Sequence, residues 1–191
     1  MSELPDGVID AARLGEEWAL TALYRQLHPA LVRFLAVRAR GEEEDLATDV
    51  WLDAARALPG FEGDADGFRR LLFTIARRRA IDHHRKRDRR RTEPADVEAL
   101  VGAGDQTTPD VVVLDEIDAE GALARIRAVL PPDQAEIVIL RVIVGLSVGE
   151  VAEVTGRRPG TVSVIQHRAL RRLARHFTAP VREPADRGES R

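Results

Sequence analysis

The sequence predicts an all-α protein of two small helical bundles joined by a flexible acidic linker, with a helix-turn-helix in the C-terminal bundle. Apolar residues recur at three- and four-residue steps in several segments, which is the period of amphipathic helices. Aromatic residues make up only 4% of the chain although hydrophobic residues make up 44%, and this favours helices rich in leucine, alanine and valine over a sheet. No segment shows the apolar–polar alternation of a strand.

Charge divides the chain in the same way. Residues 64–91 contain eleven arginines and lysines against four aspartates, and residues 157–175 contain six arginines and no acid. Between them, residues 92–120 contain nine acids and no arginine or lysine. A single block of like charge is often only a solvated surface, but two basic blocks on two predicted helices favour an anionic partner.

The N-terminal bundle is predicted to contain three long helices. Residues 1–15 allow a short helix, and a first long helix spans 16–40, with a kink or interruption expected at Pro29. A second helix spans about 43–58, with acids in its first turn that complement the helix dipole. A glycine-rich loop at 58–67 leads to a third helix, which begins near residue 66 and continues to residue 87 or beyond.

Domain boundaries follow from composition. Residues 92–114 are acidic, contain Gly, Pro and Thr, and have too few apolar side chains to form a core, so they are predicted to be a linker. This places one domain at 1–91 and another at 115–177, followed by a disordered tail at 178–191. The second domain is expected to begin with a helix to residue 129 and a buried apolar helix from about 130 to Gly145.

Residues 146–177 have the parts of a helix-turn-helix. Ser147 and Glu150 fit a capping box, Gly156 suits the left-handed position that ends a helix, and Pro159 lies near the start of the next helix. At 100° per residue, Val162, Gln166, Ala169, Leu170 and Leu173 fall on the side expected to face the core. The opposite side presents Arg168, Arg171, Arg175 and Val164, and arginine there suits phosphates or guanine edges.

Other classes of protein are less well supported. The chain has no cysteine, so it has no disulfide framework or thiolate zinc site, and no apolar run is long enough to span a membrane. We therefore expect a soluble, cytoplasmic protein without membrane insertion. Asp82, His83 and His84 are consecutive on one helix and point in different directions, and no phosphate loop or nucleophile constellation is present, so we expect no enzyme, metal or cofactor.

Two segments together resemble a known family. The stretch "EEEDLATDVWLDAARALPGFEGD", continued by "GFRRLLFTIARRRAIDHHR", is similar to the second domain of extracytoplasmic-function (ECF) RNA polymerase sigma factors of the sigma-70 family. The stretch "LPPDQAEIVILRVIVGLSVGEVAEVTGRRPGTVSVIQHRALRRL" is similar to their fourth domain. The resemblance covers residues 16–91 and 115–177. It implies a protein that binds core RNA polymerase, recognises promoter DNA and opens it.

The resemblance also implies roles for residues of the first domain. The exposed arc of the helix at 43–58 would dock on a coiled coil of the largest polymerase subunit, although the family usually has Gln at Thr48. The loop and the third helix would recognise and melt the −10 element. The implied docking residues are Asp45, Thr48, Asp49, Leu52 and Arg56. The implied −10 residues are Phe61, Gly63, Asp64, Arg77, Arg78, Asp82, His83, Arg85 and Lys86.

The second domain would bind the −35 element, but its recognition helix departs from the family. Two cations that the family often has are missing, because Ser163-Val164-Ile165-Gln166 stands where Lys-Ser-Arg-Leu is common. Either the −35 contact rests on other residues, or Val164 and Ile165 serve a protein partner, for which an anti-sigma factor is expected. A helix-turn-helix regulator and a sigma-like interaction module without initiation activity remain alternatives. The implied −35 residues are Arg157, Arg158, Thr161, Ser163, Val164, His167, Arg168 and Arg171.

Overall fold

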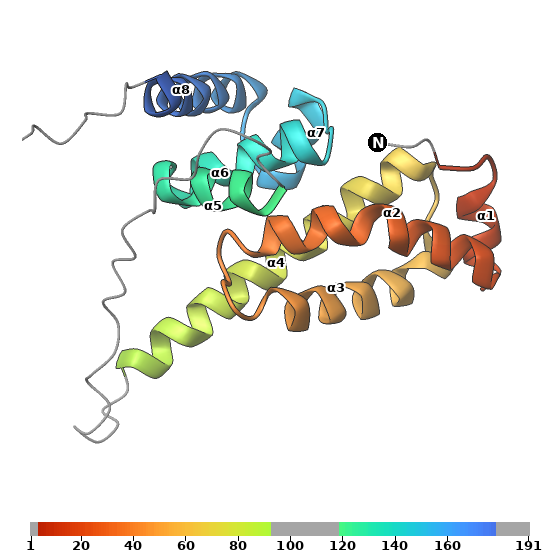
Figure 1. Cartoon of the computed structure of the whole chain (residues 1–191). Helices are drawn as coiled ribbons and strands as arrows, with labels where there is room; N and C mark the ends of the chain where they lie inside the picture. Colours follow the sequence, from red (N-terminus) through yellow and green to blue (C-terminus); the bar gives the residue numbers. More distant parts are fainter. Residues whose placement is uncertain (1–3, 93–118, 179–191) are drawn as a thin grey trace, which may run out of the picture.

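The computed structural model describes residues 4–92 and 119–178, and all regular structure within these ranges is helical (Figure 1). The all-α prediction is therefore confirmed. Thr92 and Thr178 end helices, but the rest of the predicted linker and tail lies outside the described residues. None of the described helices combines the length and the hydropathy that a membrane crossing requires.

The N-terminal bundle consists of three long helices and one short one. They are α1 (Val8–Arg13), α2 (Glu17–Leu35), α3 (Glu43–Ala57) and α4 (Ala65–Thr92), with a 3₁₀ turn, η1 (Leu58–Gly60), before the loop to α4. The expected interruption at Pro29 is wrong, because α2 continues through it. Pro29 is exposed, so water can replace the lost backbone hydrogen bond. The chain leaves α2 at Leu35 through tight turns and reaches Gly41 at a φ of 87°.

The C-terminal bundle contains four α-helices. They are α5 (Ala119–Val129), α6 (Pro132–Val138), α7 (Val148–Thr155) and α8 (Pro159–Thr178), and a π turn, η2 (Ile139–Ile143), extends α6. The predicted buried helix from 130 to 145 therefore forms without a break from Pro132 to Ile143, but its last turn is a π turn, in which the amide of Val144 donates to the carbonyl of Ile139, five residues back. The wider turn leaves Val142 63% exposed while Ile139 and Leu140 are fully buried.

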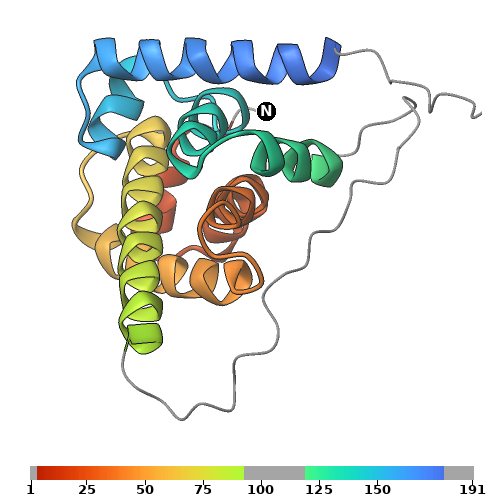
Figure 2. The ribbon, with the colours of Figure 1, turned by 90° about the vertical axis from the view of Figure 1, so that its left-hand side faces the viewer.

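The two bundles pack against each other. Their buried side chains form one continuous cluster, which includes Leu35 and Phe73 from the first bundle and Leu140 and Val151 from the second. Figure 2 shows α7 beside the N-terminal part of α4, while α8 crosses on the far side of its bundle. The sequence indicated two bundles, and the apolar pattern of each helix did not indicate that they share a core.

Candidate nucleic-acid interfaces

The predicted docking arc on α3 is exposed. Leu46, Val50 and Ala54 are buried against the bundle, while Leu52 is 51% exposed on the opposite side. Asp45, Thr48, Asp49 and Arg56 are also exposed, so all five predicted docking residues lie on one surface. Thr48 donates its hydroxyl to the carbonyl of Glu44 at 3.1 Å, so its side chain is turned back to the helix. The structure leaves the docking role a prediction.

An apolar groove beside this arc was missed from the sequence. It has a volume of about 620 Å³ between α2 and α3, and its walls include Tyr24, Trp51 and Leu52. Tyr24 is 47% exposed; its ring stacks on His28 at 4.4 Å and lies 5.3 Å from the ring of Trp51. No signal in the sequence pointed to this groove, because Leu20 and Tyr24 lie on the apolar stripe of α2, which favours burial, yet they are 40% and 47% exposed.

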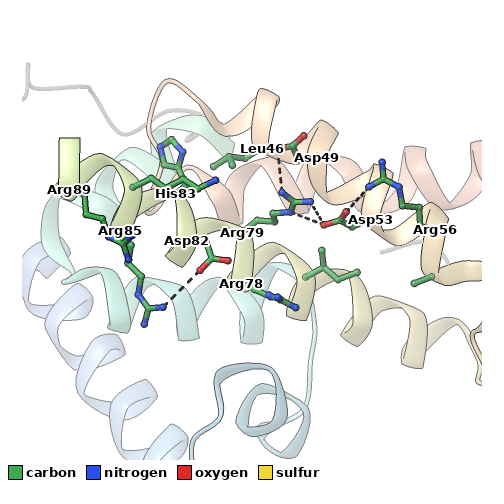
Figure 3. A pocket seen from close by; sticks show the side chains of 13 residues that line it. Leu46, Asp49, Asp53, Arg56, Arg78, Arg79, Asp82, His83, Arg85 and Arg89 are labelled. Atoms are coloured by element: carbon green, nitrogen blue, oxygen red, sulfur yellow. Dashed lines mark hydrogen bonds and ion pairs between the residues drawn. The ribbon is translucent and has the colours of Figure 1, made fainter. Parts of the chain in front are cut away.

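A charged pocket lies between α3 and α4 (Figure 3). Its volume is about 860 Å³, and five predicted −10 residues line it: Arg78, Asp82, His83, Arg85 and Lys86. Arg79 also lines the pocket, although it was not among the predicted −10 residues, and it is bound to Asp53 of α3. Its Nε lies 2.7 Å from Asp53 Oδ2, and its Nη2 lies 2.5 Å from the same oxygen. The hydrogen bond from Arg79 holds the pKa of the Asp53 carboxyl below its usual range.

The basic side chains of this pocket differ in whether they have an acidic partner. Arg85 lies 4.0 Å from Asp82 Oδ1, and His83 Nε2 lies 3.2 Å from Glu42 Oε2. Arg78 and Lys86 are exposed and have no acidic partner in the part of the chain that the structure describes. The pocket therefore offers an anionic ligand two open cations. No group of three or more metal-ligating side chains occurs among the described residues, Asp82, His83 and His84 included.

Three other predicted −10 residues lie in the loop before α4. In the loop before the helix, Asp64 Oδ1 accepts a hydrogen bond from the Gly67 amide at 2.8 Å, and Phe61 packs edge-on against Phe68 at 5.8 Å. Gly63 has a φ of 155°, and a Cβ there would lie 2.8 Å from the Phe61 ring. These three residues shape the loop at the N-terminal end of α4, and a contact of theirs with a base stays a prediction.

The helix-turn-helix forms as predicted. Ser147 and Glu150 form both hydrogen bonds of the capping box, at 3.2 Å and 2.7 Å. Gly156 ends α7 at a φ of 65°, and Pro159 begins α8. On α8, Val162, Ala169 and Leu173 are buried, so the helix faces its core as the 100° projection indicated.

Two residues of the predicted core side of α8 differ from expectation. Leu170 is 43% exposed and not buried. Gln166 is half-buried and accepts a hydrogen bond from Arg141 Nε at 3.3 Å, which explains how a polar residue is tolerated there. The projection failed at Leu170 because α8 contacts its bundle along a narrower strip than the apolar pattern suggests.

Most predicted −35 residues form one set of exposed side chains. It comprises Arg158, Thr161, Ser163, Val164, His167, Arg168 and Arg171. Val164 is 49% exposed among these cations. Arg158, Arg168 and Arg171 have no acidic partner among the described side chains, so they are available for phosphates. Arg157, predicted to belong with them, is instead bound by an acid.

Arg157 is one end of a chain of ion pairs that joins the two bundles. Its Nη2 lies 2.7 Å from Asp133 Oδ2, and Asp133 Oδ1 lies 2.6 Å from Nη2 of Arg38. The same nitrogen lies 2.8 Å from Glu136 Oε2, and Glu136 Oε1 accepts from Nε of Arg77 at 2.6 Å. In this structure Arg77 and Arg157 are therefore held by carboxylates, and their contact with DNA stays a prediction.

The directions of the pKa shifts of Arg38 and Asp133 agree with this chain of ion pairs. Burial opposes the charge of Arg38, but the hydrogen bonds and charges of Glu136 and Asp133 outweigh it and raise the pKa of Arg38. Burial likewise opposes the charge of Asp133, yet Arg38 and Arg157 hold the pKa of its carboxyl below the usual range. Arg38 and Asp133 therefore remain charged near neutral pH.

Comparison with known proteins identifies both bundles. The family described as "Sigma-70 region 2" matches residues 23–90, and "Sigma-70, region 4" matches residues 121–173. The ECF RNA polymerase sigma factor SigD of Mycobacterium tuberculosis is 33% identical over 180 residues, which cover 91% of this chain and 84% of SigD. The ECF RNA polymerase sigma factor BldN of Streptomyces coelicolor is 35% identical over 170 residues, which cover 88% of this chain and 64% of BldN.

Solved structures share the architecture. The sigma factor RpoE of Bartonella quintana, crystallised with the anti-sigma factor NepR, aligns with a TM-score of 0.61 and 24% identity, over 82% of this chain and 95% of RpoE. CnrH in complex with the cytosolic domain of CnrY aligns with a TM-score of 0.59 and 22% identity, over 89% of this chain and 94% of CnrH. Both region matches and the identity to SigD lead to one conclusion: the chain belongs to the sigma-70 family, among its ECF RNA polymerase sigma factors.

Proposed function

We propose that this sigma factor binds core RNA polymerase through α3, melts the −10 element with α4 and binds the −35 element with α8. A sigma factor is a transcription initiation factor and not an enzyme. The observation that most supports this division is that each bundle presents a helix with open arginines, Arg78 on α4 and Arg168 on α8. The corresponding domains are residues 1–91 and 115–177, and the place of action is the cytoplasm.

Docking on polymerase would use the exposed side of α3. Asp45 is exposed and has no basic partner within the described ranges, while Leu52 borders the apolar groove of Tyr24 and Trp51. An acidic rim beside an apolar groove suits a helix of the polymerase with basic and apolar residues on one face. Asp49 is less suited to docking because it lies 3.8 Å from Nη1 of Arg79.

Promoter melting would use the charged pocket beside α4. Arg78 and Lys86 would hold phosphates of the displaced strand, and capture of unstacked bases offsets an unstacking cost of a few kcal/mol per step without nucleotide hydrolysis. Arg79 is unsuited to this role, because Asp53 already engages two of its nitrogens. Instead it fixes α4 on the docking helix α3.

A protein inhibitor is the third proposed partner. Two solved structures that share this fold are complexes with NepR and CnrY, and the first of these is named an anti-sigma factor. Val164 and Leu170 on α8 are 49% and 43% exposed, which suits a partner that covers the −35 surface with apolar side chains.

Binding to core enzyme tests the docking surface. Asp45→Arg with Leu52→Glu should weaken co-purification with core RNA polymerase by more than tenfold, because it reverses one charge and places another at the groove. Arg13→Ala, at an exposed position at the end of α1, is the control and should bind as the wild type does. Both variants should keep the helical circular dichroism of the wild type. Undiminished recovery of polymerase with the double variant would refute docking through α3.

A further inference from the structure

The surface between the two bundles brings residues for nucleic acid together with internal acids. Arg77 on α4 and Arg157 before α8 belong to the two predicted DNA surfaces, and each is bound to a carboxylate of α6. Both acids, Asp133 and Glu136, lie one helical turn apart. A single short helix thus supplies carboxylates to both DNA-binding regions at once.

Glu136 is the central acid of this arrangement. It is only 2% exposed. Arg38, in the turn after α2, and Arg77, on α4, each hydrogen-bond one of its two oxygens. Both arginines belong to the N-terminal bundle. A carboxylate buried in this way is held in place by its partners, and removal of either one leaves its charge with one cationic partner instead of two.

Asp133 extends the contact to the helix-turn-helix. Its Oδ1 is bound to Arg38 of the N-terminal bundle and its Oδ2 to Arg157. Apolar packing adds to these pairs, since Val37 of the first bundle packs against the second cluster of the C-terminal bundle, formed in part by Val138 and Leu173. Arg127 also donates to the carbonyl of Ala36 at 3.3 Å.

The carboxylates of α6 bind the same guanidinium groups that would bind DNA phosphates. Arginine binds carboxylate and phosphate with the same fork of donors, so one arginine cannot satisfy both in full. Arg77 Nε is bound to Glu136 and Arg157 Nη2 to Asp133, so each arginine offers a phosphate its full fork of donors only after it leaves its carboxylate. The closed arrangement of the bundles and the binding of DNA by these two residues therefore compete.

We propose that the α6 carboxylates Glu136 and Asp133 form an intramolecular latch, which holds the free chain closed and competes with DNA phosphates for Arg77 and Arg157. The partner of this surface is the chain's own N-terminal bundle. The inference rests on the proposed function, because it concerns the same two DNA surfaces. It adds which side chains hold the two predicted DNA surfaces together, and that their separation accompanies the binding of Arg77 and Arg157 to phosphates.

Distance measurements test the latch without DNA. The chain has no cysteine, so spin labels can be placed at Leu14→Cys, 81% exposed beside α1, and at Ala128→Cys, exposed on α5. Glu136→Gln keeps the size of the side chain and removes the charge. It should broaden the distribution of label distances and shift it to longer values. Glu17 is an exposed acid on α2, so Glu17→Gln removes the same charge away from the latch. This control should leave the distribution of label distances unchanged.

A second variant and a second readout complete the test. Arg38→Gln removes the central partner from the other side and should open the chain equally, while circular dichroism should show both variants folded. In the absence of polymerase, each should bind promoter DNA roughly tenfold more tightly than Glu17→Gln, because loss of one partner from a buried ion pair shifts an equilibrium by at least that much. Unchanged label distances in both variants would overturn the latch. Failure of the wild type to initiate with core enzyme would instead refute the proposed function and leave the distance result intact.

Discussion

Replacement of two arginines on α8 gives a quantitative test of the −35 surface. Arg168 and Arg171 are exposed on the same side of the helix as Val164, and neither has an acidic partner among the residues described. Ala169, between them, is buried and positions this side of α8 away from the core. Arg168→Ala with Arg171→Ala should therefore remove DNA contacts without disturbing the packing of the helix.

The size of the effect follows from counterion release. Each phosphate contact adds about 0.9 to the slope of log K against log salt on duplex DNA, so the double variant should lose about 1.8 from that slope. Between 50 and 200 mM salt, the wild type should lose roughly 12-fold more affinity than the double variant does. Arg168→Ala alone should show about half of the change in slope.

The measurement is a salt titration of promoter binding by holoenzyme reconstituted from the full chain and core polymerase. The promoter fragment comes from selection with this holoenzyme out of random sequence. Arg13→Ala, on α1, is the control and should keep the wild-type slope. A double variant with the wild-type slope would refute the assignment of these arginines to phosphates. The reasoning that open cations on α8 mark the −35 surface would fail with it.

Three further predictions concern stability. Ser147→Ala should lower the free energy of unfolding by about 1 kcal/mol through loss of the cap, and Ser147→Asp should restore most of it; equal urea midpoints for all three proteins would contradict the role of this cap. Leu140→Ala, at a fully buried position, should cost about 2–5 kcal/mol; a cost below about 1 kcal/mol in urea unfolding would show that the shared core is loosely packed. Because Arg79 lowers the pKa of Asp53 in the folded chain, this carboxylate stabilises the fold above its unfolded pKa of about 3.9 and loses the effect as pH falls through the folded pKa. The stability difference between wild type and Asp53→Asn should therefore be largest at neutral pH and shrink below about pH 4, whereas a difference independent of pH would exclude the ion pair as its cause.

Local signals in the sequence predicted the helix-turn-helix well. Ser147, Glu150, Gly156 and Pro159 act within one or two turns of the chain, so their spacing alone specifies the ends of α7 and α8. The exposed arc of α3 could be predicted from the sequence equally well, because the apolar period placed Leu46, Val50 and Ala54 on the buried side. Such features depend on neighbours three or four residues away.

The contacts between the bundles could not be predicted in this way. Arg77 and Glu136 are 59 residues apart, and Arg38 and Glu136 are 98 apart. Periodicity carries no information about such pairs. The one available sign was Glu136 itself, a lone acid among buried apolar residues, since an acid in such a place is rarely left without a partner. The groove at Tyr24 and Trp51 was missed because an aromatic stripe on a helix usually indicates core.

The most direct test of the central claim is the mapping of transcript 5′ ends made by core RNA polymerase with and without this chain on DNA from the source genome. We expect new start sites that appear only with the chain and that share two upstream sequence elements, one at −35 and one at −10. We also expect them to be lost with Asp45→Arg/Leu52→Glu and kept with Arg13→Ala. If core polymerase gains no new start site when the chain is bound to it, the chain does not direct initiation.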